Sequence, residues 1–160
     1  MIAVEPVMYL YELLVQNIEL NDLEETVKPM KIAVECRSGR ILALGRPNML
    51  SNPYSLKYQD TIFTAYSVSE TVDSALTISF DDLIDEIGEV ELVKMNCEGC
   101  EFPALNCADI KTLKKVKRFI IHTHLQYGSS EELRQILLKL KKADFHIRKI
   151  YKDYIDVVRI

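Results

Sequence analysis

Residues with chemical potential gather in one short stretch, ELVKMNCEGCEFPAL, residues 91 to 105. An apolar run predicts a strand that ends at Asn96, and Gly99 marks a tight turn, because glycine takes a positive φ without steric cost. Two carboxylates, Glu98 and Glu101, flank this glycine. Ligands of open α/β sheets bind beyond the carboxyl ends of the strands, so Asn96, Glu98 and Glu101 are candidate site residues. Alternatively, the two carboxylates only complement the positive end of the following segment.

Cysteines are a second group with chemical potential. Cys97 and Cys100 have the C-x2-C spacing of a zinc knuckle or a redox pair. A closed zinc site needs four ligands, and the remaining cysteines and histidines form no second motif of this kind. We therefore expect no metal, and we expect buried, reduced cysteines that pack as small hydrophobic residues, with a metal protein that uses cysteine ligands as the alternative hypothesis. The four cysteines are Cys36, Cys97, Cys100 and Cys107.

Histidines end another apolar run, FIIHTH, residues 119 to 124. A single histidine at the end of a strand is commonly structural. His122 and His124 together, at the carboxyl end of a parallel strand, favour a cleft to the same degree as they favour a structural role.

The first elements that must position these residues form a β–α–β unit. Residues 2 to 4 predict a strand, apolar residues at helical spacing predict a helix from Met8, and residues 30 to 34 predict a second, parallel strand. Glu5 follows the first strand, and Pro6 suits the first position of the helix. The turn at residues 37 to 40 predicts a hairpin into a strand at 41 to 44.

The later elements alternate in the same way. We expect a strand at 75 to 78, a helix at 82 to 87 capped by Ser79 or Asp81, and a helix with a Ser129–Glu132 capping box. Residues 145 to 151 and 154 to 160 alternate like an antiparallel hairpin. The prediction is an α/β fold with a mostly parallel sheet and this hairpin at its edge.

The segment from 46 to 74 fits no element and is expected to be a long excursion. Its tyrosines would suit contacts with a sugar, although ordinary loop packing is the favoured alternative. They are Tyr54, Tyr58 and Tyr66.

Composition narrows the class of protein. The chain has 160 residues, 48% of them hydrophobic and 28% charged, which predicts a single domain over residues 1–160. A net charge of −4 argues against a general nucleic-acid binder. The apolar runs are too short to cross a bilayer, and we see neither a signal peptide nor an anchor, so we expect a cytoplasmic protein with no membrane partner.

Taken together, these segments resemble the FkbM-type branch of the S-adenosylmethionine-dependent methyltransferases. IAVEPVMYLYELLVQNIELN resembles that family's second strand and following helix. LTISFDDLIDEIGEVELVKMNCEGCEFPAL resembles its most recognisable block, which carries a lysine-x-Asp-x-Glu-Gly-x-Glu signature. RFIIHTH, with the helix and hairpin that follow, resembles the fifth strand and closing elements.

The resemblance implies a Rossmann-like methyltransferase fold and O-methyl transfer from S-adenosylmethionine to a hydroxyl of a sugar or another small-molecule acceptor. It also implies that Glu5, followed by Pro6, holds the cofactor ribose. Asn96, Glu98 and Glu101 would line the acceptor side, and His124 matches a histidine that often ends the fifth strand. A carboxylate or this histidine would take the acceptor's proton.

Three departures from the family pattern support a second hypothesis. Asn96 stands in place of the signature aspartate, and His122 replaces a usual glutamate. The family's first strand and glycine-rich cofactor loop are missing, and the five glycines form no G-x-G. The alternative is a truncated, non-catalytic methyltransferase-like module that serves in binding or assembly.

The missing strand would lie between the strands headed by Ile2 and Leu92. Two unpaired, buried strand edges would be costly, so direct pairing of these two strands is the favoured expectation. A homodimer in which a second chain fills the gap is the next alternative, and a longer gene product is the third.

Overall fold

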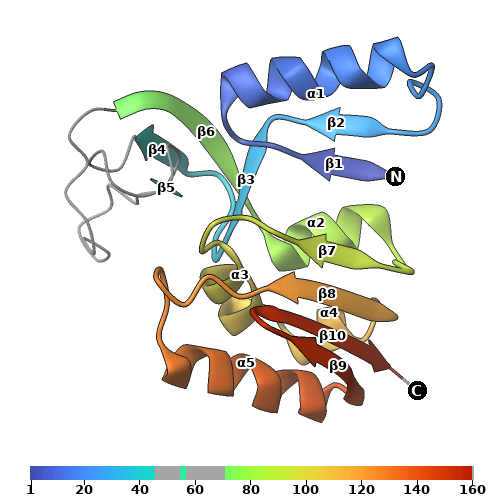
Figure 1. The fold of residues 1–160 in the computed structure, drawn as a ribbon, viewed down its shortest axis with the longest axis vertical. Coiled ribbons are helices and arrows are strands. Elements are labelled where there is room, and N and C mark those ends of the chain that lie inside the picture. The colour runs from blue at the N-terminus through green and yellow to red at the C-terminus, as the bar shows by residue number, and fades with distance from the viewer. Residues whose placement is uncertain (46–54, 57–70, 160) are drawn as a thin grey trace. The chain divides into compact units, whose positions relative to one another are not determined.

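The computed structural model describes residues 1–45, 55–56 and 71–159 (Figure 1). It contains two compact units, an N-terminal unit, Met1–Ile78, and a C-terminal unit, Ser79–Ile160, which are described separately below. Whether they form a single domain stays a prediction. The three tyrosines at positions 54, 58 and 66, and most of the expected excursion, lie outside the described residues.

The N-terminal unit begins with the predicted β–α–β arrangement. Strands β1 (Ile2–Val4) and β2 (Lys28–Met30) pair in parallel, and helix α1 (Met8–Leu20) connects them. The residue before the helix, Val7, has no side chain that could cap it. The Asp73 carboxylate caps the helix instead, because its Oδ2 accepts a hydrogen bond from the Met8 amide at 2.5 Å. The β–α–β arrangement is thus confirmed, with a distant residue fixing the start of the helix, but its second strand lies at Lys28–Met30 rather than at residues 30 to 34.

The rest of this unit corrects the predicted hairpin. Strands β3 (Ile32–Glu35), β4 (Ile41–Gly45), β5 (Ser55–Leu56) and β6 (Thr71–Ser79) form a sheet in the order β3-β6-β4-β5. Strand β6 therefore lies between β3 and β4, and these two do not pair as a hairpin. The reason is that Thr77 of β6 binds the connecting turn, accepting the Gly39 amide at 3.0 Å and donating to the Arg40 carbonyl at 2.8 Å.

A small apolar core accompanies this sheet. It brings together the residue before α1 and buried residues of three of the strands. Leu10 of the helix packs against them. The cluster consists of Val7, Ala33, Leu42, Leu44 and Ala75.

The C-terminal unit has one four-stranded sheet, in the order β7-β8-β10-β9 (Figure 1). Strands β7 and β8 are parallel, whereas β10 runs antiparallel to both of its neighbours, β8 and β9. The predicted C-terminal hairpin is confirmed. The elements are α2 (Phe80–Ile87), β7 (Val93–Met95), α3 (Glu101–Cys107), α4 (Ile110–Leu113), β8 (Arg118–His122), α5 (Ser130–Lys142), β9 (Phe145–Tyr151) and β10 (Tyr154–Arg159).

Local signals set the helix ends in this unit. The Ser79 hydroxyl accepts the Asp82 amide at 3.0 Å at the start of α2, and Gly88 ends this helix with φ +88°. At α5, Ser129 and Glu132 form the predicted capping box. These ends are confirmed because capping needs only residues close in sequence.

Aromatic rings hold the helices on this sheet. Phe119 of β8 lies 6.0 Å from Phe80 of α2 and 5.3 Å from Phe145 of β9, measured between ring centroids. Helix α5 packs against α3, α4 and β9 and buries Ile136 and Leu140. These contacts pack α2 and α5 against the sheet that carries the candidate site.

As a whole, the described part is a mixed α/β structure with several sheets. A single, mostly parallel sheet is not confirmed, because parallel and antiparallel pairs occur together. Within the units, β1 pairs with β2 and β7 pairs with β8. The expected direct pairing of β1 with β7 would join the two units and stays a prediction. No helix in the described ranges has the length and hydropathy needed to span a bilayer.

Candidate functional site

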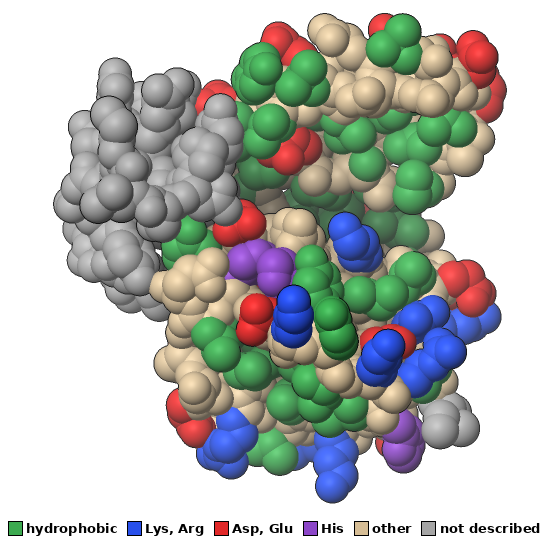
Figure 2. All heavy atoms as spheres, in the orientation of Figure 1, with side chains coloured by type: hydrophobic (Ala, Val, Ile, Leu, Met, Phe, Trp, Pro, Cys, Tyr) green, Lys and Arg blue, Asp and Glu red, His purple; other side chains and the backbone are tan. Residues whose placement is uncertain are grey.

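The candidate residues of the C-terminal unit meet where β7 and β8 end. These parallel strands are in register, with Met95 opposite Ile121. The segment from Asn96 to Glu101, which we call the elbow, then leads into α3. Glu98 and Gly99 both have a positive φ, of 51° and 107°, which produces the sharp change of direction predicted at the glycine. Figure 2 shows histidine atoms at the surface close to the arrowheads of β7 and β8 in Figure 1.

Glu101 is the most enclosed charged residue of the site, with 1% of its surface exposed. Its Oε1 accepts the His124 amide at 2.7 Å and lies 3.0 Å from His124 Nδ1. Its Oε2 accepts the Gly99 amide at 3.0 Å. An ionised Glu101 therefore requires the hydrogen of a neutral His124 ring to be on Nδ1, which leaves Nε2 as the acceptor nitrogen.

His124 lies between two carboxylates. Its Nε2 is 3.3 Å from Oε1 of Glu98, which is ion-pair distance without the alignment of a hydrogen bond. Both Nε2 and the second oxygen of Glu98, Oε2, are buried and have no hydrogen-bond partner among the described residues. Buried polar atoms are nearly always paired, so this pair of atoms is suited to a polar group supplied by another molecule.

Asn96 contacts the other histidine. Its Oδ1 lies 2.5 Å from His122 Nδ1, and the His122 ring is 4.1 Å from the His124 ring between centroids. On its other side His122 stacks on Tyr154, at 4.2 Å and 6° between the ring planes. Tyr154 was not predicted as a site residue. It could have been found only from the pairing of β8 with β10, which places it opposite His122.

Two glycines allow the elbow and the loop after β8 to approach closely. A Cβ on Gly99 would lie 2.7 Å from Tyr127 Cβ, and a Cβ on Gly128 would lie 2.5 Å from atoms of the Phe102 ring. Larger residues would push the loop away from the elbow. The distance between Glu101 and His124 therefore depends on these two positions.

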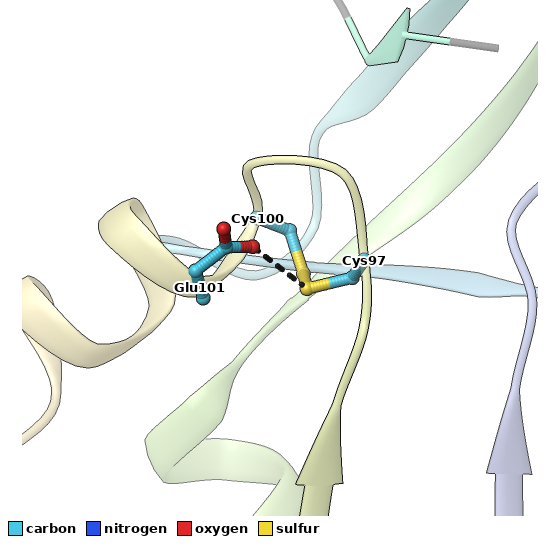
Figure 3. A group of neighbouring side chains, drawn as sticks. All are labelled: Cys97, Cys100 and Glu101. Carbon is cyan, nitrogen blue, oxygen red and sulfur yellow. Dashed lines mark hydrogen bonds between the residues drawn. A yellow bond between two sulfur atoms is a disulfide. The ribbon is translucent and has the colours of Figure 1, made fainter. Parts of the chain in front are cut away.

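The cysteine prediction is wrong. Cys97 and Cys100 form a disulfide across the elbow, and none of the four cysteines is free. The sequence could not show this, because a disulfide requires the two Cβ atoms to face each other, and the turn at Glu98 and Gly99 brings them together. Figure 3 shows the disulfide beside Glu101, whose Oε2 lies 3.4 Å from Cys97 Sγ.

Cys97, Cys100 and Glu101 are also a group of potential metal ligands, with their ligand atoms within 4.8 Å of one another. Thiolates bind metal ions, however, and a disulfide has none. In its oxidised form this group therefore does not suit a metal. The expectation that the protein holds no metal stays a prediction.

Glu5 and Pro6 belong to the N-terminal unit, just after β1. The Glu5 carboxylate accepts a hydrogen bond from the Val7 amide at 2.9 Å, and the backbone amide of Glu5 donates to the Met30 carbonyl at 3.1 Å. Burial raises the pKa of Glu5, and the hydrogen bond from Val7 partly offsets this rise. The sequence-predicted residues are thus divided between the units: Asn96, Glu98, Glu101 and His124 come together in one, and Glu5 and Pro6 lie in the other.

A comparison with family models gives one match, described as Methyltransferase FkbM domain, over residues 1–147. No curated protein and no solved structure matches the chain.

Proposed function

The chain belongs to the FkbM methyltransferase family, and from this premise we propose that it transfers a methyl group from S-adenosylmethionine to a hydroxyl oxygen of a small molecule, such as a sugar. The observation that carries the proposal is the placement of His124 between Glu101 and Glu98 at the ends of two adjacent parallel strands. Sites of α/β proteins form at such strand ends.

The chain's own residues would position the acceptor and receive its proton. Glu101 fixes the ring of His124, so that Nε2 faces Glu98 without a hydrogen bond of its own. An acceptor hydroxyl that donates to Nε2 would satisfy this buried nitrogen, and His124 would then hold the proton released on transfer. Glu98 Oε2 would accept from a second hydroxyl and orient the acceptor. Asn96, held by His122, would line the same side.

For the cofactor, we propose that Glu5 binds the two ribose hydroxyls, with Pro6 fixing the chain after it. The carboxylate fits this part, because it follows a parallel strand and is oriented by the Val7 amide. When bound, S-adenosylmethionine supplies an electrophilic methyl group on a sulfonium. Positioning of the acceptor oxygen is then the main task left to the protein.

The finer architectural and cellular assignments are proposals of the same kind. Family membership supports a Rossmann-like arrangement of the elements and a single domain. The net charge of −4 supports a small-molecule acceptor rather than nucleic acid. A cytoplasmic location, no membrane partner and a homodimer remain proposals as well.

The second candidate is a non-catalytic module with a methyltransferase-like fold. The burial of His124, which is 3% exposed, favours it, because a proton acceptor must be reached by its substrate. So does Asn96, which is neutral and has its Oδ1 against His122. In this case the Glu101–His124 contact would only fasten the elbow to the loop after β8.

The test is calorimetry of the purified chain with S-adenosylmethionine and S-adenosylhomocysteine, followed by transfer of a labelled methyl group to a panel of sugars and small alcohols. We expect binding and transfer, and we expect His124→Asn to lower the rate about 100-fold or more with cofactor affinity unchanged. Glu131→Gln, at an exposed position of α5, is the control. Absence of binding at millimolar ligand would eliminate the enzymatic function for this chain and leave the binding module.

A further inference from the structure

The Cys97–Cys100 disulfide has features that neither methyl transfer nor folding requires. It joins two residues three apart in sequence, with Cα atoms 5.4 Å apart, so it closes only a short loop. Cross-links of short loops constrain the unfolded chain less than those of long loops. The C-x2-C spacing is also that of redox-active pairs. Stabilisation is therefore a weak reason for this disulfide.

The two cysteines differ in exposure. Cys97 is half-buried, whereas Cys100 is 6% exposed. A small thiol or disulfide in solution would therefore reach Cys97 first. Cys100 would react only with its neighbour, as a resolving cysteine does.

A proton acceptor is already beside the sulfur of the more exposed cysteine. Glu101 Oε2 lies 3.4 Å from Cys97 Sγ (Figure 3). The carboxylate cannot move away, because the Gly99 amide holds Oε2 and the His124 amide holds Oε1. In the reduced form the Cys97 thiol would donate its hydrogen bond directly to this oxygen.

We propose that Cys97 and Cys100 are a thiol–disulfide exchange site for small disulfides and thiols, in which Cys97 is the attacking cysteine, Cys100 resolves, and Glu101 accepts the proton of the Cys97 thiol. The proposal rests on the disulfide, the unequal exposure of its two cysteines and the fixed carboxylate, and it is independent of methyl transfer.

The exchange balances with a small disulfide, RSSR, as the oxidant. The Cys97 thiol gives its proton to Glu101, and the thiolate attacks one sulfur of RSSR, which breaks the S–S bond and releases one thiolate. The Cys100 thiol then loses its proton, and its sulfur attacks Cys97 Sγ, which releases the second thiolate. Two electrons and two protons pass from the protein to two RSH molecules. The reverse reaction, with a dithiol as reductant, reduces the pair.

The first experiment measures exchange in the full chain. The protein is first reduced with dithiothreitol and then mixed with glutathione disulfide. Samples taken at successive times are labelled with a thiol reagent. Mass spectrometry of peptides assigns the label to each of the four cysteines. We expect Cys97 and Cys100 to cycle together and reversibly. A pair that dithiothreitol leaves oxidised, or that glutathione disulfide does not reoxidise, overturns the proposal.

The second experiment uses single variants to test the roles of Cys97 as the attacking cysteine and Cys100 as the resolving cysteine. In Cys100→Ser, Cys97 should form a mixed disulfide with glutathione at least tenfold faster than Cys100 does in Cys97→Ser. Equal rates, or the reverse order, would contradict the assignment of Cys97. This comparison does not require a change at the buried carboxylate.

The third experiment addresses Glu101 in the Cys100→Ser background. Glu101→Gln should slow the reaction of Cys97 about tenfold near neutral pH and make its rate rise with pH as hydroxide replaces the missing base. Glu91→Gln, at an exposed carboxylate paired with Lys117, should change neither. A folded Glu101→Gln protein with an unchanged rate and pH profile would refute the part given to Glu101. Failure of methyl transfer would affect none of these readouts.

Discussion

At the scale of single residues, Glu101 connects three parts of the candidate site. Its two oxygens contact the elbow through the Gly99 amide, the loop after β8 through His124, and the disulfide through Cys97. A buried carboxylate is costly unless it is fully hydrogen-bonded. This one is, so its surroundings are ordered around it.

Glu101→Ala should therefore be strongly destabilising. It leaves the buried amide of His124 and the partly buried amide of Gly99 without acceptors, and each such loss costs about 1–3 kcal/mol. We expect the free energy of unfolding to fall by about 3 kcal/mol in urea titrations. Glu91→Ala, at the exposed end of a surface ion pair, should change it by less than about 0.5 kcal/mol. Similar losses for both variants would mean that Glu101 is not fixed as described.

Gly99→Ala should also destabilise the C-terminal unit. The residue has φ +107°, and the new Cβ would lie 2.7 Å from Tyr127 Cβ. Backbone strain and overpacking together should cost about 2–4 kcal/mol. Gly88→Ala is a matched control, because Gly88 has φ +88° but no atom near its Cβ position. Its cost, from strain alone, should be about 1 kcal/mol in the same urea titration. Equal costs would show that the contact with Tyr127 contributes nothing.

At the scale of elements, α1 takes its capping group from a strand 65 residues later in the chain. Asp73 of β6 accepts the Met8 amide and lies 3.5 Å from Lys31 Nζ. Partial burial alone would raise the pKa of Asp73, but the hydrogen bonds from the Met8 and Ser74 amides and the charge of Lys31 lower it below the usual 3.8. The ionised carboxylate is thus the form that holds the helix.

Asp73→Asn should reduce the free energy of unfolding at neutral pH by about 1 kcal/mol. Because the pKa of Asp73 is lower in the folded state, its contribution is present above pH 3.8 and is lost as the pH falls through the folded pKa. Urea titrations at a series of pH values should therefore show the two proteins converging in acid. A difference that stays constant down to pH 2 would contradict an ionic cap.

How well the elements were predicted depends on how local their signals are. The β–α–β unit, the Ser79 cap, the capping box of α5 and the C-terminal hairpin were predicted correctly, because residues close in sequence determine them. The hairpin of β3 and β4 was wrong, since Thr77 of a distant strand competes for the turn. The parallel character of the whole sheet was not confirmed for a similar reason: strand order is a long-range property.

The same distinction applies to the site. Asn96, Glu98 and Glu101 were predicted as site residues because they follow a strand of an α/β sheet, and His124 because it ends a later strand. The C-terminal unit brings these four together. Their catalytic roles stay predictions. The stacking of Tyr154 on His122 and the disulfide were missed, because one depends on strand register and the other on backbone geometry in the elbow.

At the scale of the whole molecule, cofactor binding should be visible as stability. A ligand that binds only the folded state adds about 2.7 kcal/mol at a concentration 100 times its Kd. We expect S-adenosylhomocysteine to raise the unfolding midpoint in thermal scans of the wild type. Glu5→Gln should abolish most of this rise if Glu5 binds the ribose. An identical rise in both proteins would exclude Glu5 from the cofactor site.

Without ligand, Glu5→Gln should increase the stability of the protein relative to the wild type as the pH rises. Burial raises the pKa of Glu5 above 4.5 in the folded state, so protonation favours folding. Its contribution is complete below pH 4.5 and is lost as the pH rises through the folded pKa. The variant, which carries no charge, should therefore gain stability relative to the wild type between pH 4 and pH 7. Parallel curves over this range would contradict a Glu5 pKa that partial burial raises.

The strand order β3-β6-β4 has a consequence for how the protein is made. A chain leaving the ribosome exposes β3 and β4 early, yet neither can pair with β6, the neighbour that they share, until this strand, which begins at Thr71, has been synthesised. Until then, each of these two apolar strands has an unpaired edge on the side where β6 will lie. Nascent chains with such exposed edges aggregate or recruit chaperones. The speed of synthesis between Gly45 and Thr71 should therefore influence the yield of soluble protein. Synonymous slow codons placed in that interval would test this.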